Sequence, residues 1–285
     1  MKDFEELMNL SPSSPFCLFT YYCDNLGDHI QTLALLQHVT PRILVPRDQL
    51  TPQRGLSLIA NGWLTGGKLP RTEDFRHVRY VGVHVTRGLR NIETANAMKG
   101  CGVVGSRDPA TSAFLTKHGV ANYLTRCATL TFPTYSGKRE GIYCVDVRND
   151  IKESLLKSYK DALFVTHDLP GLSLDQVNDK IIASQFREAY ALLARYRTAE
   201  LVITARLHAT LPCMAFGTPV IYVGVPSILD DRITVLDRLG VKMVTGIAGS
   251  IPPSALRKPP PVDASRFRER YVEFLRQSID EIDKH

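Results

Sequence analysis

The segment LVITARLHATLPCMAFGTPVIYV, residues 201–223, contains the signals of a strand, a helix and a second strand in succession. Residues 201–203 and 220–223 are short apolar runs typical of buried strands, and the residues between them predict an apolar helix over 206–216. Strands that are joined through a helix are typical of a parallel sheet with helices on its faces. The segment therefore predicts an α/β fold.

The same alternation of apolar runs and amphipathic stretches extends outward from this segment in both directions. It predicts ten strands and seven further helices, whose boundaries carry an error of about 2–4 residues. The other strands are expected over 16–22, 42–45, 56–59, 78–85, 102–105, 122–126, 142–147 and 163–167, and the other helices from residue 25 and over 92–98, 109–118, 151–159, 180–197, 232–239 and 264–283.

A break in this pattern predicts the division of the chain into domains. The 285 residues exceed the usual size of one domain, and residues 131–140 contain Pro133, Ser136 and Gly137 among several charges, which favours a linker. We expect an N-terminal Rossmann-like domain over 1–135, a C-terminal one over 136–262, and a final helix within 263–285 that crosses back to the first domain, as in many such folds.

Composition narrows the class of protein. The formal net charge is +6, but Lys and Arg are spread along the chain, which favours small anionic substrates over nucleic acid. The six cysteines form no CxxC pair and no histidine spacing suggests a metal, so neither a metal nor a cofactor is expected. No apolar run approaches about 18 residues, and residues 1–10 are a poor signal peptide, so we expect a cytoplasmic protein.

Three junctions between a predicted strand and a predicted helix are rich in functional residue types. Ligands of open α/β sheets bind beyond the carboxyl ends of the strands, where such junctions lie. GxGxxG, HExxH and GxSxG are absent, and Gly66-Gly67-Lys68 lacks the spacing of a P-loop. The junctions are Asn25-Leu26-Gly27-Asp28-His29 with Gln31, Ser106-Arg107-Asp108, and Thr204-Ala205-Arg206-Leu207-His208.

The third junction is the most informative. Arg206 and His208 in the first turn of a helix oppose the helix dipole, whereas Arg206 together with free backbone N–H groups would bind an anion strongly. The dipole should keep His208 neutral until a bound phosphate makes it a proton donor. The alternative is that Arg206 pairs with a nearby carboxylate and His208 fills a polar gap.

The other two junctions leave more alternatives open. Arg107 could be a second anion ligand, while Asp108 before Pro109 is expected to cap a helix. Gly27 would permit close approach of a ligand to the backbone, and Asp28 could be a helix cap or a base for a sugar hydroxyl. His84, and likewise His167 with Asp168, could face the cleft or be structural.

In order and spacing, these residues resemble the polysaccharide pyruvyl transferase family. The resemblance covers roughly residues 16–240 and rests on the three junctions, on Leu115 and Gly119, and on Gly217-Thr218-Pro219-Val220. It implies a fold similar to that of GT-B glycosyltransferases, with two Rossmann-like domains facing across a cleft and a hinge between them. It also implies transfer of pyruvate from phosphoenolpyruvate to a sugar of a polysaccharide or its precursor, as a cyclic ketal on two hydroxyls.

The resemblance further implies a role for each site residue. Arg206 and the amide of Leu207 would hold the carboxylate or phosphate of the donor, Arg107 would add a positive contact, and His208 would be the general acid. The loop from Asn25 through Gly27 to Asp28 would face the acceptor, with Asp28 as a candidate base, and His84 is the match for a histidine of the first domain. The acceptor is expected to be a sugar or a lipid-linked glycan, which could bring the protein to a membrane surface; the oligomeric state is unknown.

Two other functions fit the same residues. A GT-B-like glycosyltransferase would bind the diphosphate of a nucleotide sugar at Arg206, with Asp230 or Asp231 near the ribose. A non-catalytic homologue would keep the fold and bind a sugar phosphate; the joint presence of Arg107, Arg206 and His208 argues against it.

Overall fold

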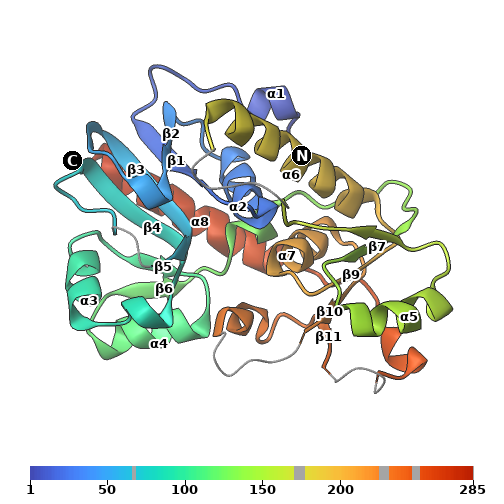
Figure 1. Ribbon diagram of the computed structural model, residues 1–285. Helices are drawn as coiled ribbons and strands as arrows, with labels where there is room; N and C mark the ends of the chain where they lie inside the picture. Colours follow the sequence, from blue (N-terminus) through green and yellow to red (C-terminus); the bar gives the residue numbers. More distant parts are fainter. Residues whose placement is uncertain (66–68, 170–176, 225–230, 246–250, 285) are drawn as a thin grey trace.

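Two parallel sheets organise the chain (Figure 1). The computed structural model describes residues 1–65, 69–169, 177–224, 231–245 and 251–284. The first sheet has the order β2-β1-β3-β4-β5-β6 and the second the order β11-β10-β9-β7-β8. The strands are β1 (Phe16–Thr20), β2 (Ile43–Pro46), β3 (Gln53–Leu64), β4 (Phe75–Val85), β5 (Val104–Ser106), β6 (Asn122–Leu124), β7 (Ile142–Val145), β8 (Leu163–Val165), β9 (Leu201–Thr204), β10 (Val220–Val223) and β11 (Lys242–Val244).

The helices begin where the sequence supplies polar caps. The side chain of Asn25 accepts a hydrogen bond from the backbone of Gly27, and Asp108 accepts one from Thr111. The α-helices are α1 (Phe4–Leu7), α2 (Leu26–Leu36), α3 (Ile92–Lys99), α4 (Pro109–Lys117), α5 (Asn149–Ser158), α6 (Asp179–Thr198), α7 (Leu207–Phe216) and α8 (Ser265–Asp283), and the 3-10 helices are η1 (Arg47–Gln49), η2 (Arg87–Leu89), η3 (Ala128–Thr131), η5 (Asp231–Leu236) and η6 (Pro253–Leu256).

The structure confirms the predicted α/β fold class, with two Rossmann-like halves facing across a cleft. Several elements differ from prediction, among them the short helix α1 and the 3-10 helices η1, η2, η3 and η6, which were not predicted. The α-helix expected over 232–239 is the 3-10 helix η5, and Arg238 follows it at a left-handed φ of 60°. Strand β11 was not predicted. The segment Gly66-Gly67-Lys68 lies outside the described residues.

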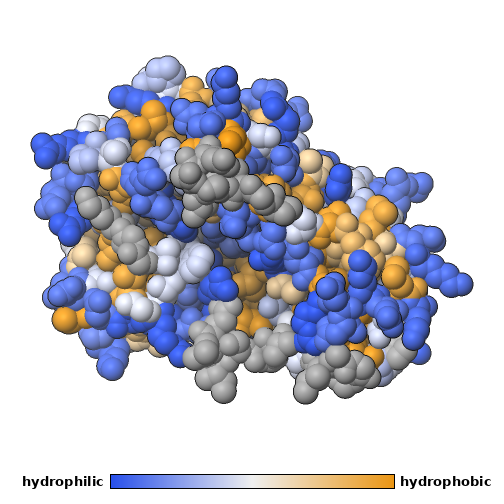
Figure 2. Space-filling view, viewed as in Figure 1, coloured by the Kyte–Doolittle hydropathy of each residue, from blue (hydrophilic) through white to orange (hydrophobic). Residues whose placement is uncertain are grey.

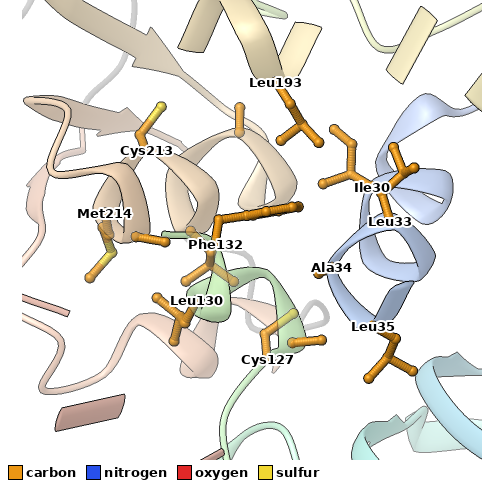
Figure 3. Close-up of a cluster of buried hydrophobic side chains, with 14 of the residues drawn as sticks. Ile30, Leu33, Ala34, Leu35, Cys127, Leu130, Phe132, Leu193, Cys213 and Met214 are labelled. Atoms are coloured by element: carbon orange, nitrogen blue, oxygen red, sulfur yellow. The ribbon is translucent and has the colours of Figure 1, made fainter. Parts of the chain in front are cut away.

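A single hydrophobic core joins the two halves (Figure 3). Ile30 and Leu33 of α2, from the first half, belong to the same buried cluster as Leu193 of α6 and Cys213 of α7, from the second. Phe132, at the start of the connection between the sheets, is fully buried among them. Because rotating one half against the other would expose this core, the packing opposes the expected hinge. The exact boundary between the domains stays a prediction.

Helix α8 follows the second sheet in the chain but lies along the first (Figure 1). The hydroxyl of Tyr271 donates to the carbonyl of Val81 in β4 at 3.1 Å, and the ring of Phe274 stacks on Tyr123 of β6. The last helix therefore ties the end of the chain to the first half. Within the described segments, no helix is long and apolar enough to cross a membrane.

Candidate active site

A cavity of about 330 Å³ lies at the carboxyl ends of both sets of strands. This is the edge at which parallel sheets bind ligands. Hydrophilic side chains cover much of both halves in the view of Figure 2. Four arginines and two aspartates line the cavity, so its walls favour an anion. The lining residues are Cys23, Asp24, Asn25, Asp28, Arg47, Trp63, Arg107, His167, Ala205, Arg206, Leu207, His208, Tyr222, Arg232 and Ile233.

Arg107 is a buried cation at the end of β5, with a side chain only 2% exposed. Its Nη1 donates to Oε1 of Gln31 at a long 3.4 Å, and its Nε lies 3.9 Å from Oδ2 of Asp108. That Nε has no hydrogen-bond partner among the described residues. A buried guanidinium is costly unless it is well paired. Arg107 therefore has donor capacity left for a ligand in the cavity.

Arg206 lies at the N-cap position of α7, in an extended conformation, and not in the first helical turn as predicted. Its Nε donates to Oδ2 of Asp146 at 2.8 Å, and its Nη2 to Oδ2 of Asp168 at 2.5 Å. In the empty cavity Arg206 is thus paired with carboxylates, which was the structural alternative to anion binding in the sequence analysis. The side chain is nevertheless 31% exposed and lines the cavity, so a ligand can reach it.

His208 lies in the first turn of α7 and lines the cavity. Burial, followed by the positive charge of Arg107, holds the pKa of His208 well below its ordinary value of 6.5. The histidine is therefore neutral in the empty cavity, as predicted. The cause differs from the predicted one, because burial and the charge of Arg107 lower the pKa, whereas the helix dipole was expected to do so. Its Nε2 is buried without a hydrogen-bond partner among the described residues.

The start of α2 forms another part of the cavity wall. Asn25 caps this helix, with its Oδ1 2.7 Å from the backbone N of Gly27, so Asp28 is not the cap. Asp28 accepts from Nε2 of Gln31 at 2.9 Å and lies 3.9 Å from Nη1 of Arg47. Burial raises the pKa of the Asp28 carboxyl above its usual range. The raised pKa makes the carboxylate a better proton acceptor than an exposed aspartate.

Gly27 was predicted to let a ligand approach the backbone closely, but its surroundings in the structure indicate another role. It is not among the residues that line the cavity. A Cβ at this position would lie 3.0 Å from Nδ1 of His208 and 3.3 Å from Nδ1 of His167. Gly27 therefore makes room for two imidazoles of the other half.

His84 is not among the residues that line the cavity. It is 1% exposed, and its Nδ1 is 2.7 Å from Oδ2 of Asp108, which caps α4 as predicted. On the other side, Nε2 of His84 lies 3.6 Å from Oδ1 of Asp231, which pairs with Arg90 at 2.5 Å. These contacts place His84 in a polar network between the halves, and its contact with a substrate stays a prediction. Asp230 lies outside the described residues.

Several residues in or next to the wall were not predicted from the sequence. Arg47 lines the cavity, and Asp146 contacts the lining residue Arg206. Each directly follows a strand, which was the available signal. Trp63, the only tryptophan of the chain, is the penultimate residue of β3. Its ring lies 5.8 Å from the guanidinium of Arg47 and 5.0 Å from that of Arg232. No local pattern marked Trp63 or Arg232 as site residues.

Comparison with known proteins assigns the chain to a family. A family model described as "Polysaccharide pyruvyl transferase" matches residues 81–227, which is more than half of the chain. No curated protein matches.

Solved structures resemble the chain only distantly. A functionally uncharacterized protein, KP1_0663 from Klebsiella pneumoniae, is 14% identical with a TM-score of 0.47, covering 82% of this chain and 94% of its own. The glycosyltransferase SnogD from Streptomyces nogalater is 13% identical with a TM-score of 0.37, covering 95% and 96%.

Proposed function

Because the chain belongs to the polysaccharide pyruvyl transferase family, we propose that it transfers pyruvate from phosphoenolpyruvate to a sugar of a polysaccharide or its precursor, forming a cyclic ketal. The observation that carries this proposal is one cavity lined by Arg107 from the first half and by Arg206 and His208 from the second. The two cations suit a small donor with two anionic groups, and the histidine suits a donor whose double bond must take up a proton.

The donor carries a carboxylate and a phosphate. Arg206 and the amide of Leu207, the first residue of α7, bind one of these groups, because a helix N-terminus offers free N–H groups to an anion. Arg107, which lines the same cavity, binds the other. The two arginines thereby place a positive charge beside each anionic group of the donor.

In the reaction, one sugar hydroxyl adds to C2 of the enol while C3 takes up a proton and becomes a methyl group. The bond between C2 and the phosphate oxygen breaks, and the second hydroxyl adds to C2 to close the ketal ring. Of the two hydroxyl protons, one balances the proton gained by C3 and the other leaves on hydrogen phosphate. His208 donates its proton to C3 or to the departing phosphate.

The acceptor side of the cavity is formed by Asn25 and Asp28 at the start of α2. Asp28 accepts the proton of an attacking hydroxyl, and its raised pKa supports this role. A sugar presented on a lipid or a nucleotide is the class of acceptor that we propose.

The proposal is tested by incubating the protein with phosphoenolpyruvate and a panel of lipid-linked and nucleotide-linked sugars while following phosphate release. Phosphoenolpyruvate alone should raise the melting temperature, since a ligand stabilises the fold that binds it. Arg206→Ala should abolish this stabilisation. The matched control is Arg71→Ala, which removes an arginine whose side chain is 62% exposed and pairs with Glu73. Stabilisation by UDP or GDP in place of phosphoenolpyruvate would contradict the proposal and favour a glycosyltransferase.

A further inference from the structure

Two carboxylates hold the guanidinium of Arg206, and they differ in their surroundings. The side chain of Asp146 is 12% exposed, whereas that of Asp168 is 58% exposed. Oδ2 of Asp146 accepts from Nε of Arg206 and also from the backbone N of His167, at 2.9 Å. The Asp168 carboxylate contacts Arg206 alone among the described residues. One partner is thus built into the fold and the other is held by a single contact.

Asp146 is the fixed partner. It follows β7 with a left-handed φ of 48°, a conformation that Asp tolerates better than most residues. Through its carboxylate it joins the ends of three neighbouring strands, β7, β8 and β9, because His167 follows β8 and Arg206 follows β9. Asp146 therefore sets the orientation of the guanidinium whether or not a ligand is bound.

Asp168 is the exchangeable partner. Exposed ion pairs are weak because water screens them, and only the backbone of Asp168 is tied down, by pairing with Asn25. With Nε held by Asp146, an incoming carboxylate or phosphate can bind the fork of Arg206 at two points only through Nη1 and Nη2. Asp168 accepts one of the two N–H groups of Nη2, and its negative charge opposes a second anion at that nitrogen.

We propose that Asp168 is an internal competitor of the anionic donor: its carboxylate pairs with Arg206 in the empty cavity and gives up Nη2 when the donor binds. The inference rests on the proposed function only for the identity of the anion. It makes Asp168 a determinant of donor affinity that acts by opposing binding. Asp146 and Asp168 then have opposite effects although they touch the same side chain.

The test measures the dissociation constant of phosphoenolpyruvate by calorimetry and by the fluorescence of Trp63, which lines the same cavity. Asp168→Asn should bind the donor about 2- to 5-fold more tightly, the range that the loss of one exposed ion pair allows. Asp146→Asn should bind it more weakly. Asp168→Ser should also bind the donor more tightly, which would show that the effect comes from loss of the carboxylate and not from a new contact of the asparagine.

Asp24→Asn is the matched control, because Asp24 is an exposed aspartate of the same cavity. It removes the same charge from another part of the wall and should change the dissociation constant less than Asp168→Asn does. Equal effects of the two variants, or unchanged or weaker binding by Asp168→Asn, would overturn the inference.

Inorganic pyrophosphate as a second probe separates this inference from the proposed function. If phosphoenolpyruvate fails to bind but Asp168→Asn still tightens pyrophosphate binding, the competitor role stands and the proposed donor does not. If phosphoenolpyruvate binds and turns over but Asp168→Asn gives no gain, the competitor role fails and the proposed function stands. Binding of neither anion by any of the proteins would overturn both.

Discussion

Gly27 of the first half lies so close to His208 of the second that a Cβ on Gly27 would stand 3.0 Å from Nδ1 of the imidazole. The same Cβ would lie 2.8 Å from Oδ1 of Asn25, the cap of α2. The starts of α2 and α7 therefore meet at a point that has no space for a methyl group. The proposed acid is held in place by a contact between the two halves.

We predict that Gly27→Ala lowers kcat by about 10-fold or more, because His208 or the cap must move. The variant should also lose about 1–3 kcal/mol of unfolding free energy through overpacking, although Gly to Ala ordinarily stabilises a helix. Phosphate release and urea unfolding measure the two effects. Gly88→Ala is the control, since a Cβ there would meet nothing within 4 Å. A Gly27→Ala protein as active and as stable as the wild type would refute this account of the contact.

Arg107→Gln should raise the pKa of His208, because burial and then the charge of Arg107 are the two largest causes of its low value. The variant should also bind phosphoenolpyruvate about 10- to 100-fold more weakly, the usual effect of losing a hydrogen bond to a charged group. NMR titration of His208 and calorimetry check the two statements, with Arg71→Gln as the control. An unchanged titration curve would show that the charge of Arg107 does not act on His208.

The pH dependence of the reaction should differ between kcat and kcat/KM. A general acid must be protonated, so the rate falls as the pH rises through its pKa. The empty cavity holds the pKa of His208 well below 6.5, chiefly through burial, whereas the bound phosphate and carboxylate of the donor should raise it. Because kcat reports the complex and kcat/KM the free protein, the descending limb of kcat should lie at higher pH, after correction for titration of the free donor.

His208→Asn should remove that limb and lower kcat by about 100-fold or more while donor binding is retained. Rates measured from pH 5 to 9 on both proteins provide the comparison. Wild-type turnover by His208→Asn would exclude His208 as the acid.

Buried histidines should make the fold sensitive to acid. Burial lowers the pKa of His29 and of His167 to about 4, against an ordinary value of 6.5. Each contributes stability above pH 6.5 that is lost as the pH falls toward 4, because unfolding lets the imidazole take up a proton. We predict that His29→Leu reduces the loss of unfolding free energy between pH 7 and 5. Urea unfolding at the two pH values tests this, and equal losses in both proteins would contradict it.

Local signals in the sequence were sufficient for most of the fold. Asp108-Pro109 before an apolar helix and Gly119 after it marked α4 at both ends, and the glycine has the expected left-handed φ of 66°. Strand β11 has three residues, of which the central one, Met243, is 41% exposed, and it was not predicted, whereas β6, of the same length and with Tyr123 42% exposed, was. Short elements stabilised by their neighbours in the sheet leave little trace in the sequence.

The site was predictable only in part, for a physical reason. Arg107, Arg206 and His208 follow or open regular elements, so their place at the cavity could be predicted from local pattern. The partners of Arg206 could not, since Asp146 and Asp168 reach it from neighbouring strands 60 and 38 positions away in the chain. His84 shows the converse, because a histidine at the right strand end proved to be turned into an internal network.

The buried cluster around Phe132 has a consequence for engineering. Since α2 of one half and α6 and α7 of the other bury their apolar faces in the same cluster, neither half has a finished surface of its own. A fragment cut at the connection between the sheets would expose this apolar surface and aggregate. A chimera with one half from a relative would need the residues on both sides of the interface between the halves to be redesigned together. Substitution of residues that line the cavity therefore disturbs the packing of the halves less than exchange of a whole half would.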